Sequence, residues 1–212
     1  MIESYLSDDY WTLSGPGTAH TRVLGSRFSA IAFHVADESE LESKLMELKK
    51  TEFDATHHCW AHVIRKDHEL RERVSDDGEP KGTAGLPILH EIRKQNLQNI
   101  AVIVARWFGG TKLGTGGLVR AYGECGALAI GNAVRVQRKT GVIVAVDTPF
   151  ELQSVVYQLA ASSFAHVEQV SSEGDARLLV KLRRAQAEAF CVALRDRSAG
   201  RLAGFIEGEW TS

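Results

Sequence analysis

The stretch from Ile100 to Ile130 constrains the fold of this chain more than any other, because it joins an apolar strand to a long helix through a glycine-rich loop. Ile100–Ala105 is a continuous apolar run rich in β-branched residues, which is typical of a strand buried on both faces. Apolar residues then recur at helical spacing from Leu118 to Ala129. Five glycines separate the two elements: Gly109, Gly110, Gly114, Gly116 and Gly117. Glycine weakens regular structure, so this density predicts unusual backbone angles or a close approach by another group.

Cationic side chains accompany the glycine-rich loop. Arg106 follows the strand, Lys112 lies inside the loop, and Arg120 lies in the first turns of the helix. Backbone N–H groups at a helix N-terminus, flanked by cations, can hold an anion, although a loop that needs glycine only to turn tightly fits the same spacing. Residues 106–139 carry six Lys or Arg against one acid, Glu124, in a chain of net charge −2. This asymmetry favours an anionic partner.

The loop does not match the phosphate-binding motifs of the common nucleotide folds. A P-loop requires Lys and Ser or Thr at the positions where Thr115 and Gly116 stand, and the dinucleotide fingerprint lacks its last glycine. The chain also has no G-x-S-x-G nucleophile elbow. The motifs therefore do not favour a hydrolase or a protein with a common nucleotide-binding fold.

A second polar segment, Ser75–Pro80, places three carboxylates within four positions: Asp76, Asp77 and Glu79. They could hold Mg²⁺, which prefers oxygen ligands, or serve as a paired acid and base. They could also cap local N–H groups in a solvated turn, the interpretation that spacing alone favours. A further alternative pairs them with Arg106 or Arg120, which would lock the two loops together without a ligand.

His57–Ile64 is predicted to be a strand in which His58, Trp60 and His62 share one face. Histidine and cysteine bind zinc, but side chains two positions apart on a strand lie roughly 7 Å from each other. No second ligand pair with the spacing of a zinc finger follows. We therefore predict no metal site, and we expect a histidine of this strand to be held by hydrogen bonds at the edge of a cleft.

The polarity of the chain rises at Gln137–Gly141, and we place a boundary there between a domain of residues 1–137 and one of residues 140–212. The second part reads as strand, helix, strand, strand, helix, strand, with a hairpin turning at Glu173-Gly174-Asp175. That order in about 70 residues predicts a ferredoxin-like βαββαβ domain. The fold class is therefore α+β.

Composition limits the broad class of protein. With 44% hydrophobic and 25% charged residues, the chain is typical of a globular protein and not of a disordered one. No apolar run approaches 18 residues, and the acidic first residues do not resemble a signal peptide, so we expect a cytoplasmic protein without membrane contact. Three cysteines without C-x-x-C spacing predict reduced, mostly buried thiols.

Three long blocks resemble the IMPACT/YigZ family: ATHHCWA (55–61), SDDGEPKGTAGLPIL (75–89) and VARWFGGTKLGTGGLVRAYG (104–123). The resemblance implies an N-terminal domain like a ribosomal-protein domain with a left-handed βαβ crossover, an exception to the usual handedness. It also implies a C-terminal domain like the last domain of elongation factor G. Eukaryotic members are linked to control of translation initiation through protein partners. One departure is that family members often carry a more basic run before Ser-Arg-Phe, whereas here Arg27 stands nearly alone.

The favoured function is a translation-associated binding protein that contacts RNA, the ribosome or a translation-control protein, without a cofactor or DNA specificity. In this hypothesis Arg106, Lys112 and Arg120 contact phosphates, while Trp107 and Tyr122 offer exposed aromatic rings. The alternative is a Mg²⁺-dependent phosphate- or nucleotide-binding enzyme that uses the carboxylates and the glycine loop. The candidate binding residues are Arg106, Gly109, Gly110, Lys112, Gly114, Gly116, Gly117, Arg120, Tyr122, His58, Asp76, Asp77 and Glu79. No residue is assigned a catalytic role, and the sequence does not predict an oligomeric state.

Overall fold

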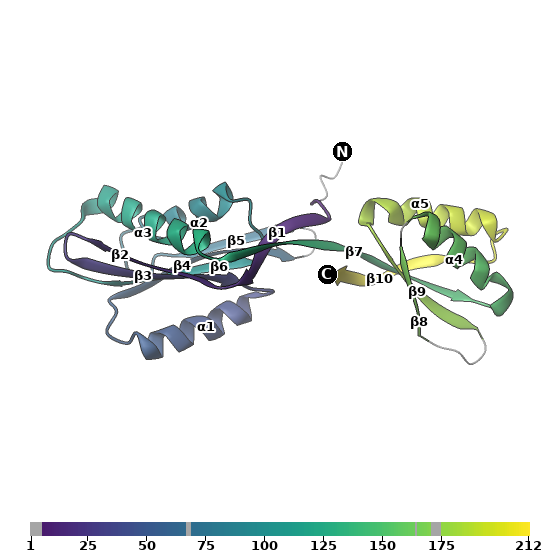
Figure 1. Cartoon of the computed structure of the whole chain (residues 1–212), viewed down its shortest axis with the longest axis horizontal. Coiled ribbons are helices and arrows are strands. Elements are labelled where there is room, and N and C mark those ends of the chain that lie inside the picture. The colour runs from purple at the N-terminus through teal and green to yellow at the C-terminus, as the bar shows by residue number, and fades with distance from the viewer. Residues whose placement is uncertain (1–5, 67–68, 164, 171–174) are drawn as a thin grey trace. The chain divides into compact units, whose positions relative to one another are not determined.

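The structure is a computed structural model that describes residues 6–66, 69–163, 165–170 and 175–212. The chain divides into two compact units, one containing residues 10–137 and the other containing residues 7–9 and 138–212. Both are mixed α/β structures with antiparallel sheets, which confirms the α+β class at that level (Figure 1). None of the helices in the described part is long and apolar enough to cross a membrane.

The first unit is built on a five-stranded sheet. Its strands in spatial order are β2 (Gly17–Val23), β3 (Ser26–His34), β6 (Ile100–Trp107), β4 (His57–Lys66) and β5 (Glu69–Ser75). All neighbouring pairs are antiparallel. Because β3 and β4 both run antiparallel to β6, they are parallel to each other, and α1 (Glu38–Thr51) lies in the connection between them. The central position of β6 explains why Ile100–Arg106 is buried throughout, as its apolar run predicts.

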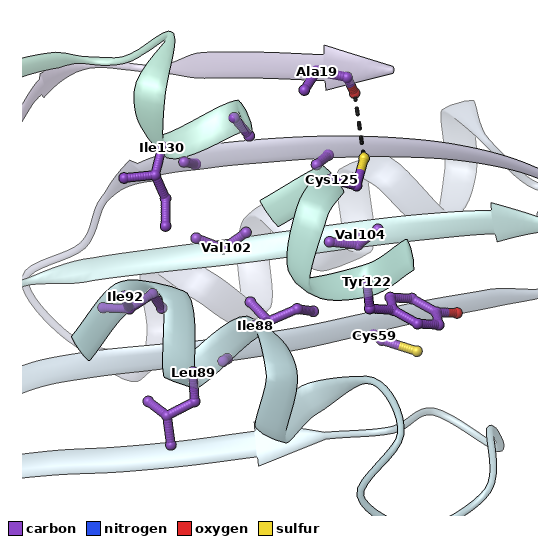
Figure 2. Packing of buried hydrophobic residues seen from close by; sticks show 14 of the residues in the cluster. Ala19, Cys59, Ile88, Leu89, Ile92, Val102, Val104, Tyr122, Cys125 and Ile130 are labelled. Carbon is purple, nitrogen blue, oxygen red and sulfur yellow. Dashed lines mark hydrogen bonds between the residues drawn. The ribbon is translucent and has the colours of Figure 1, made fainter. Parts of the chain in front are cut away.

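Helices lie on both faces of this sheet. α1 covers one face, and α2 (Gly85–Lys94) and α3 (Gly114–Gly131) cover the other (Figure 1). Under α2 and α3, the side chains of Ile88 and Tyr122 pack in one cluster with Val102 and Val104 of β6 (Figure 2). Each large apolar side chain buried in this way contributes roughly 1.5–3 kcal/mol by leaving water. The cluster therefore holds α3 against β6, and with it the glycine-rich loop that joins them.

The start of α1 is predicted by its sequence. The Asp37 carboxylate accepts hydrogen bonds from the backbone N–H groups of Ser39 (2.9 Å) and Glu40 (3.1 Å). The Glu40 carboxylate in turn accepts one from the backbone N–H of Ala36 (2.9 Å). The first N–H groups of a helix have no partner within it, so this reciprocal bonding stabilises the helix start.

The sequence does not predict β2 and β5, the two outer strands of this sheet. No residue of β5 is fully buried, and only two residues of β2 are. An edge strand buries little surface, so its sequence lacks the apolar run that identifies a central strand.

The second unit contains one antiparallel sheet and two longer helices. Its elements are β7 (Val134–Thr148), a short 3₁₀ helix η1 (Phe150–Leu152), α4 (Gln153–Ser162), β8 (His166–Gln169), β9 (Ala176–Leu182), α5 (Arg184–Arg197) and β10 (Gly204–Thr211). The spatial strand order is β10, β7, β9, β8, and β1 (Asp9–Gly15) also pairs with β7. The predicted turn residues Glu173 and Gly174 lie outside the described residues. β7 continues unbroken through residues 137–141, so the chain passes from one unit to the other as a strand.

Candidate functional site

The polar segment Ser75–Pro80, which we call the acidic segment, connects the end of β5 to α2. Its first carboxylate, that of Asp76, caps α2. The Asp76 side chain accepts hydrogen bonds from the backbone N–H groups of Gly82 (2.7 Å), Ala84 (3.0 Å) and Gly85 (2.9 Å). Partial burial alone would raise the pKa of Asp76, but these three bonds outweigh it and hold that pKa below its usual range. Asp76 is therefore ionised at neutral pH, and both of its oxygens are occupied.

Asp77 ties the same segment to β4. Its carboxylate accepts a hydrogen bond from the backbone N–H of His58 (2.6 Å), and its other oxygen lies 3.4 Å from the Lys49 ammonium. Its backbone carbonyl accepts a hydrogen bond from Nδ1 of His57 (2.7 Å). Asp77 has a φ of +41°, a left-handed conformation that aspartate adopts more readily than most residues. The turn is thus fixed from both its main chain and its side chain.

Glu79 forms a buried ion pair with Arg106. Oε1 of Glu79 accepts a hydrogen bond from the Arg106 guanidinium (2.6 Å) and another from the Tyr122 hydroxyl (2.7 Å). The side chains of Glu79 and Arg106 are only 4% and 6% exposed. A second guanidinium nitrogen donates to Oγ of Ser26 (3.2 Å). Desolvated charges of this kind persist only when they are paired and hydrogen-bonded.

Strand alternation places Arg106 in this pair. Arg106 stands opposite Phe28 of β3 and His57 of β4 in the sheet. The Phe28 ring meets the Tyr122 ring edge to face, with centroids 5.2 Å apart, on the side covered by α3. Residues directly opposite each other on paired strands share a face, so the guanidinium also reaches that side. The arginine that ends the apolar run of β6 is therefore drawn into the core and is not left in the loop.

Two groups beside this pair, the Cys59 thiol and the Tyr122 hydroxyl, are neutral. The Cys59 thiol donates a hydrogen bond to the backbone carbonyl of Asp76 (3.0 Å). Burial raises the pKa of Cys59 to about 12 and raises the pKa of Tyr122 above its usual value. A thiol that stays protonated is a poor nucleophile, so Cys59 is a structural residue.

The glycine-rich loop begins with a close backbone approach. A Cβ on Gly109 would lie 1.9 Å from the carbonyl carbon of Gly25, so only glycine fits there. The Gly109 N–H also donates to Oγ of Ser26 (3.2 Å). Gly110 and Gly114 have φ values of +86° and +67°, in the left-handed region that favours glycine. Both explanations predicted for this glycine density therefore occur in the loop.

The outer part of the loop is exposed and cationic. Lys112 and Arg120 are exposed, and neither forms an ion pair in the part of the chain that the structure describes. The first turn of α3 carries no acidic residue and no side-chain cap. A Cβ on Gly116 would meet nothing within 4 Å, whereas one on Gly117 would lie 3.0 Å from Cβ of Leu113. We call residues 108–117 together with Arg120 the glycine-loop surface.

The predicted site residues therefore separate into two layers. The first, which we call the buried layer, is buried or half-buried and bonded inside the fold, and it comprises Asp76, Asp77, Glu79, Arg106 and Tyr122. The second is exposed or half-exposed and comprises Gly109, Gly110, Lys112, Gly114, Gly116, Gly117 and Arg120. Two expectations are wrong: Tyr122 is fully buried, and Arg106 is occupied by Glu79 instead of being open to phosphate.

His58 stands apart from both layers. Its side chain is buried, and its Nε2 lies 3.9 Å from the Glu52 carboxylate at the end of α1, without a hydrogen bond. Burial, aided by the charge of Lys49, lowers the pKa of His58. Its imidazole is neutral at physiological pH and does not join the carboxylates of the acidic segment.

Two residues of the site, Ser26 and Gly25, are not predicted from the sequence. Ser26 bridges Arg106 and Gly109, and Gly25, with a φ of +83°, accepts the backbone of the loop. A Gly-Ser pair ahead of a strand signals a turn but does not identify contacts 80 and 83 positions away. Only strand pairing between β3 and β6 brings them together.

The carboxylates of the acidic segment are used in bonds within the fold, and the glycine loop faces solvent. Within the described residues, no three His, Cys, Asp or Glu side chains gather as a metal site. The three carboxylates of the acidic segment bond to different elements, so they do not converge on a common point. What the site offers to solvent is a cationic glycine loop at a helix N-terminus, which can accept an anionic partner.

Comparison with known proteins identifies the family to which the chain belongs. Residues 24–130 match the family model of the Impact N-terminal domain. The IMPACT family member YigZ of Escherichia coli is 33% identical over 205 residues, which cover 89% of this chain and 93% of that protein. This chain belongs to the IMPACT family.

Solved structures include two relatives of this IMPACT family member. The crystal structure of a hypothetical protein is 27% identical, covers 94% of this chain and 98% of its own, and superposes with a TM-score of 0.68. The two-domain translational regulator Yih1 is 28% identical over 58% of this chain and 47% of its own, with a TM-score of 0.33. Only the first superposition carries weight for the fold.

Proposed function

We propose that this protein is a translation-associated binding protein whose glycine-loop surface contacts RNA, the ribosome or a protein of translation control. One observation carries the proposal. Lys112 and Arg120 are exposed without ion-pair partners in the described residues, beside a helix N-terminus that no side chain caps. Cations and free N–H groups in this arrangement attract phosphate or carboxylate groups.

The buried layer gives this surface a fixed shape. Glu79, Arg106 and Ser26 join the acidic segment, β6 and the turn between β2 and β3 by hydrogen bonds, directly behind the loop. A binding surface whose backbone is already ordered loses less entropy when a partner docks. We therefore assign the acidic segment to the support of the surface and not to the binding itself.

Family membership supports the same proposal. The eukaryotic members that this chain resembles are linked to control of translation initiation through protein partners. A cytoplasmic location is part of the proposal. We also propose a ribosomal-protein-like first domain with a left-handed crossover and a ferredoxin-like second domain that resembles the last domain of elongation factor G. In support of the latter, β9 lies between β7 and β8 in one antiparallel sheet, as in a split βαβ arrangement.

The enzyme alternative has no comparable support. Mg²⁺ requires several free oxygen ligands, but both oxygens of Asp76 accept bonds from backbone N–H groups, and Oε1 of Glu79 accepts bonds from Arg106 and Tyr122. Moving either carboxylate toward a metal would uncover a helix N-terminus or a buried arginine. The binding function is therefore the better proposal.

The test is binding of the purified protein to bulk RNA and to ribosomes across a salt series. For single strands, log K falls with log salt by roughly 0.7 for each contacted phosphate. Lys112→Gln and Arg120→Gln should each weaken binding for every sequence and lower that slope by about one contact.

Lys50→Gln is the matched control. This exposed cation lies in α1, on the other face of the sheet, and its loss should leave affinity unchanged. Binding that survives Lys112→Gln and Arg120→Gln together would remove the glycine-loop surface from the proposal. Capture of a translation-control protein that persists after nuclease treatment would assign the surface to a protein partner instead of RNA.

A further inference from the structure

The sheet face that carries α1 contains a second recess, separate from the glycine-loop surface. α1 covers a cluster that includes Val35, Ile64 and Ile103. At the end of α1 a pocket of about 500 Å³ opens against β2, β3 and the end of β6. Its polar wall consists of His20, Arg22, Arg27, Ser29, Glu52 and the indole of Trp107. Its volume lies within the range of small-molecule sites.

Strand register explains why these side chains gather. Arg27 stands directly opposite Arg22 on β2 and Trp107 on β6, and His20 stands opposite Ser29. Directly opposite residues share a face of a sheet. The intervening Phe28 packs against Tyr122 on the α3 side, so its neighbours along β3 face the α1 side.

The pocket holds two arginines that nothing neutralises. Arg22 and Arg27 form no ion pair in the described part of the chain, although they are cross-strand neighbours. Like charges directly opposite each other destabilise a sheet. The Arg27 guanidinium lies over the Trp107 ring, 4.9 Å from its centroid, which orients it without neutralising it. Glu52 supplies the one carboxylate of the described lining, and burial raises its pKa.

The ring of Trp107 forms part of the pocket wall beside Arg27. Its indole Nε1–H is inaccessible to solvent and makes no hydrogen bond, so it is the ring and not the N–H that is open to a ligand. Two unpaired guanidiniums beside an aromatic ring are suited to a ligand that joins negatively charged oxygens to a flat ring.

We propose that this pocket binds a nucleoside phosphate, with Arg22 and Arg27 on the phosphate and the sugar and base filling the space beside Trp107. Two guanidiniums on one strand pair match the geometry and the double charge of a phosphate monoester. The volume is more than an inorganic phosphate needs. The nucleoside and its phosphate can come from a free mononucleotide or from a nucleotide of single-stranded RNA, whose diester phosphate carries one negative charge instead of two. The pocket shares no residue with the glycine-loop surface, so this inference does not rest on the function proposed above.

The experiment titrates the full-length protein with 5′-AMP, 5′-UMP, inorganic phosphate and a short single-stranded RNA, measured by calorimetry and by thermal shift. We expect the nucleotides to bind and to raise the melting temperature, and Arg22→Gln and Arg27→Gln each to weaken binding about tenfold or more. Trp107→Phe keeps a ring but reduces its area, and should weaken binding by a smaller factor. Lys94→Gln changes an exposed cation of α2 on the other face of the sheet and should leave nucleotide affinity unchanged.

Several outcomes would overturn the proposal. Wild-type protein that binds none of the four probes, or nucleotide affinity that falls with Arg120→Gln but not with Arg27→Gln, would do so. Inorganic phosphate that binds as tightly as 5′-AMP would refute the nucleoside part. Binding of the RNA but not of mononucleotides, lost with Arg27→Gln, would support the pocket and identify RNA as the source. Because Arg22→Gln and Arg27→Gln each remove a repulsion, we expect both variants to fold, which the thermal melt without ligand verifies.

Discussion

Replacing Glu79 by glutamine tests whether the buried ion pair is the main support of the site. The change keeps the side-chain volume but leaves Arg106 as an uncompensated charge whose side chain is only 6% exposed. Removing one partner of a buried pair costs about 3–5 kcal/mol. For a unit of this size that corresponds to a fall in melting temperature of roughly 10–20 °C.

The assay is chemical and thermal unfolding followed by near-ultraviolet circular dichroism, which reports the packed Tyr122 and its neighbours. The chain has two units, so the transition of the first must be resolved from that of the second before a free energy is assigned. A loss below about 1 kcal/mol for Glu79→Gln would refute the reasoning, because it would mean that Arg106 is solvated and that the pair behaves like a surface salt bridge.

Two variants control this experiment. Tyr122→Phe removes only the hydroxyl that donates to Glu79 and should cost about 1.5–3 kcal/mol, the range for a hydrogen bond to a charged group. The double variant Glu79→Gln with Arg106→Met removes both charges, so it should be more stable than Glu79→Gln alone. A double variant that is less stable than the single one would show that the two side chains act independently.

Three further predictions follow from the same site. Asp76→Asn should lower the free energy of unfolding by about 0.5–2 kcal/mol, as for the loss of a helix cap. Because folding lowers the pKa of Asp76, its stabilising contribution is present above the unfolded pKa and is lost as the pH falls. Thermal melts between neutral and acidic pH should therefore show a smaller loss of stability for the variant than for the wild type. Gly109→Ala should destabilise the first unit because its Cβ would clash with the backbone of Gly25. Gly116→Ala, which has open space around it in α3, should stabilise the unit by about 0.5–1 kcal/mol, and a urea titration of both variants measures the two effects. Native protein at pH 8 should resist carboxymethylation at Cys59, whose pKa is about 12, and peptide mapping that finds rapid labelling there would contradict the burial of that thiol.

The central elements could be predicted from the sequence because their signals are local. The apolar run of β6 and the cap of α1 each depend on residues within a few positions of one another. The outer strands β2 and β5 could not, since a strand with few buried residues has no periodic apolar pattern. The cap of α2 could not be predicted either, because Asp76 lies nine positions before Gly85.

For the site, too, the local signals could be predicted from the sequence and the long-range contacts could not. The sequence predicts its candidate residues in two polar segments, and pairing of the carboxylates with Arg106 or Arg120 was one of the alternatives left open. Spacing could not decide between the two arginines, because the choice depends on the face of β6 to which Arg106 points. The pocket beside Trp107 left no trace in the sequence pattern, since its residues lie on separate strands that meet only in the folded sheet.

The long-range bonds of the acidic segment have a consequence for the order of folding. Glu79 bonds to residues 27 and 43 positions later in the chain, on β6 and α3. Loops of that length must close before these bonds can form, so the segment is expected to become ordered after the central strands and helices have assembled. Glu79→Gln should then accelerate unfolding while leaving the refolding rate nearly unchanged in stopped-flow measurements. The acidic segment would thus act as a kinetic latch, closing last and setting how long the first unit stays folded.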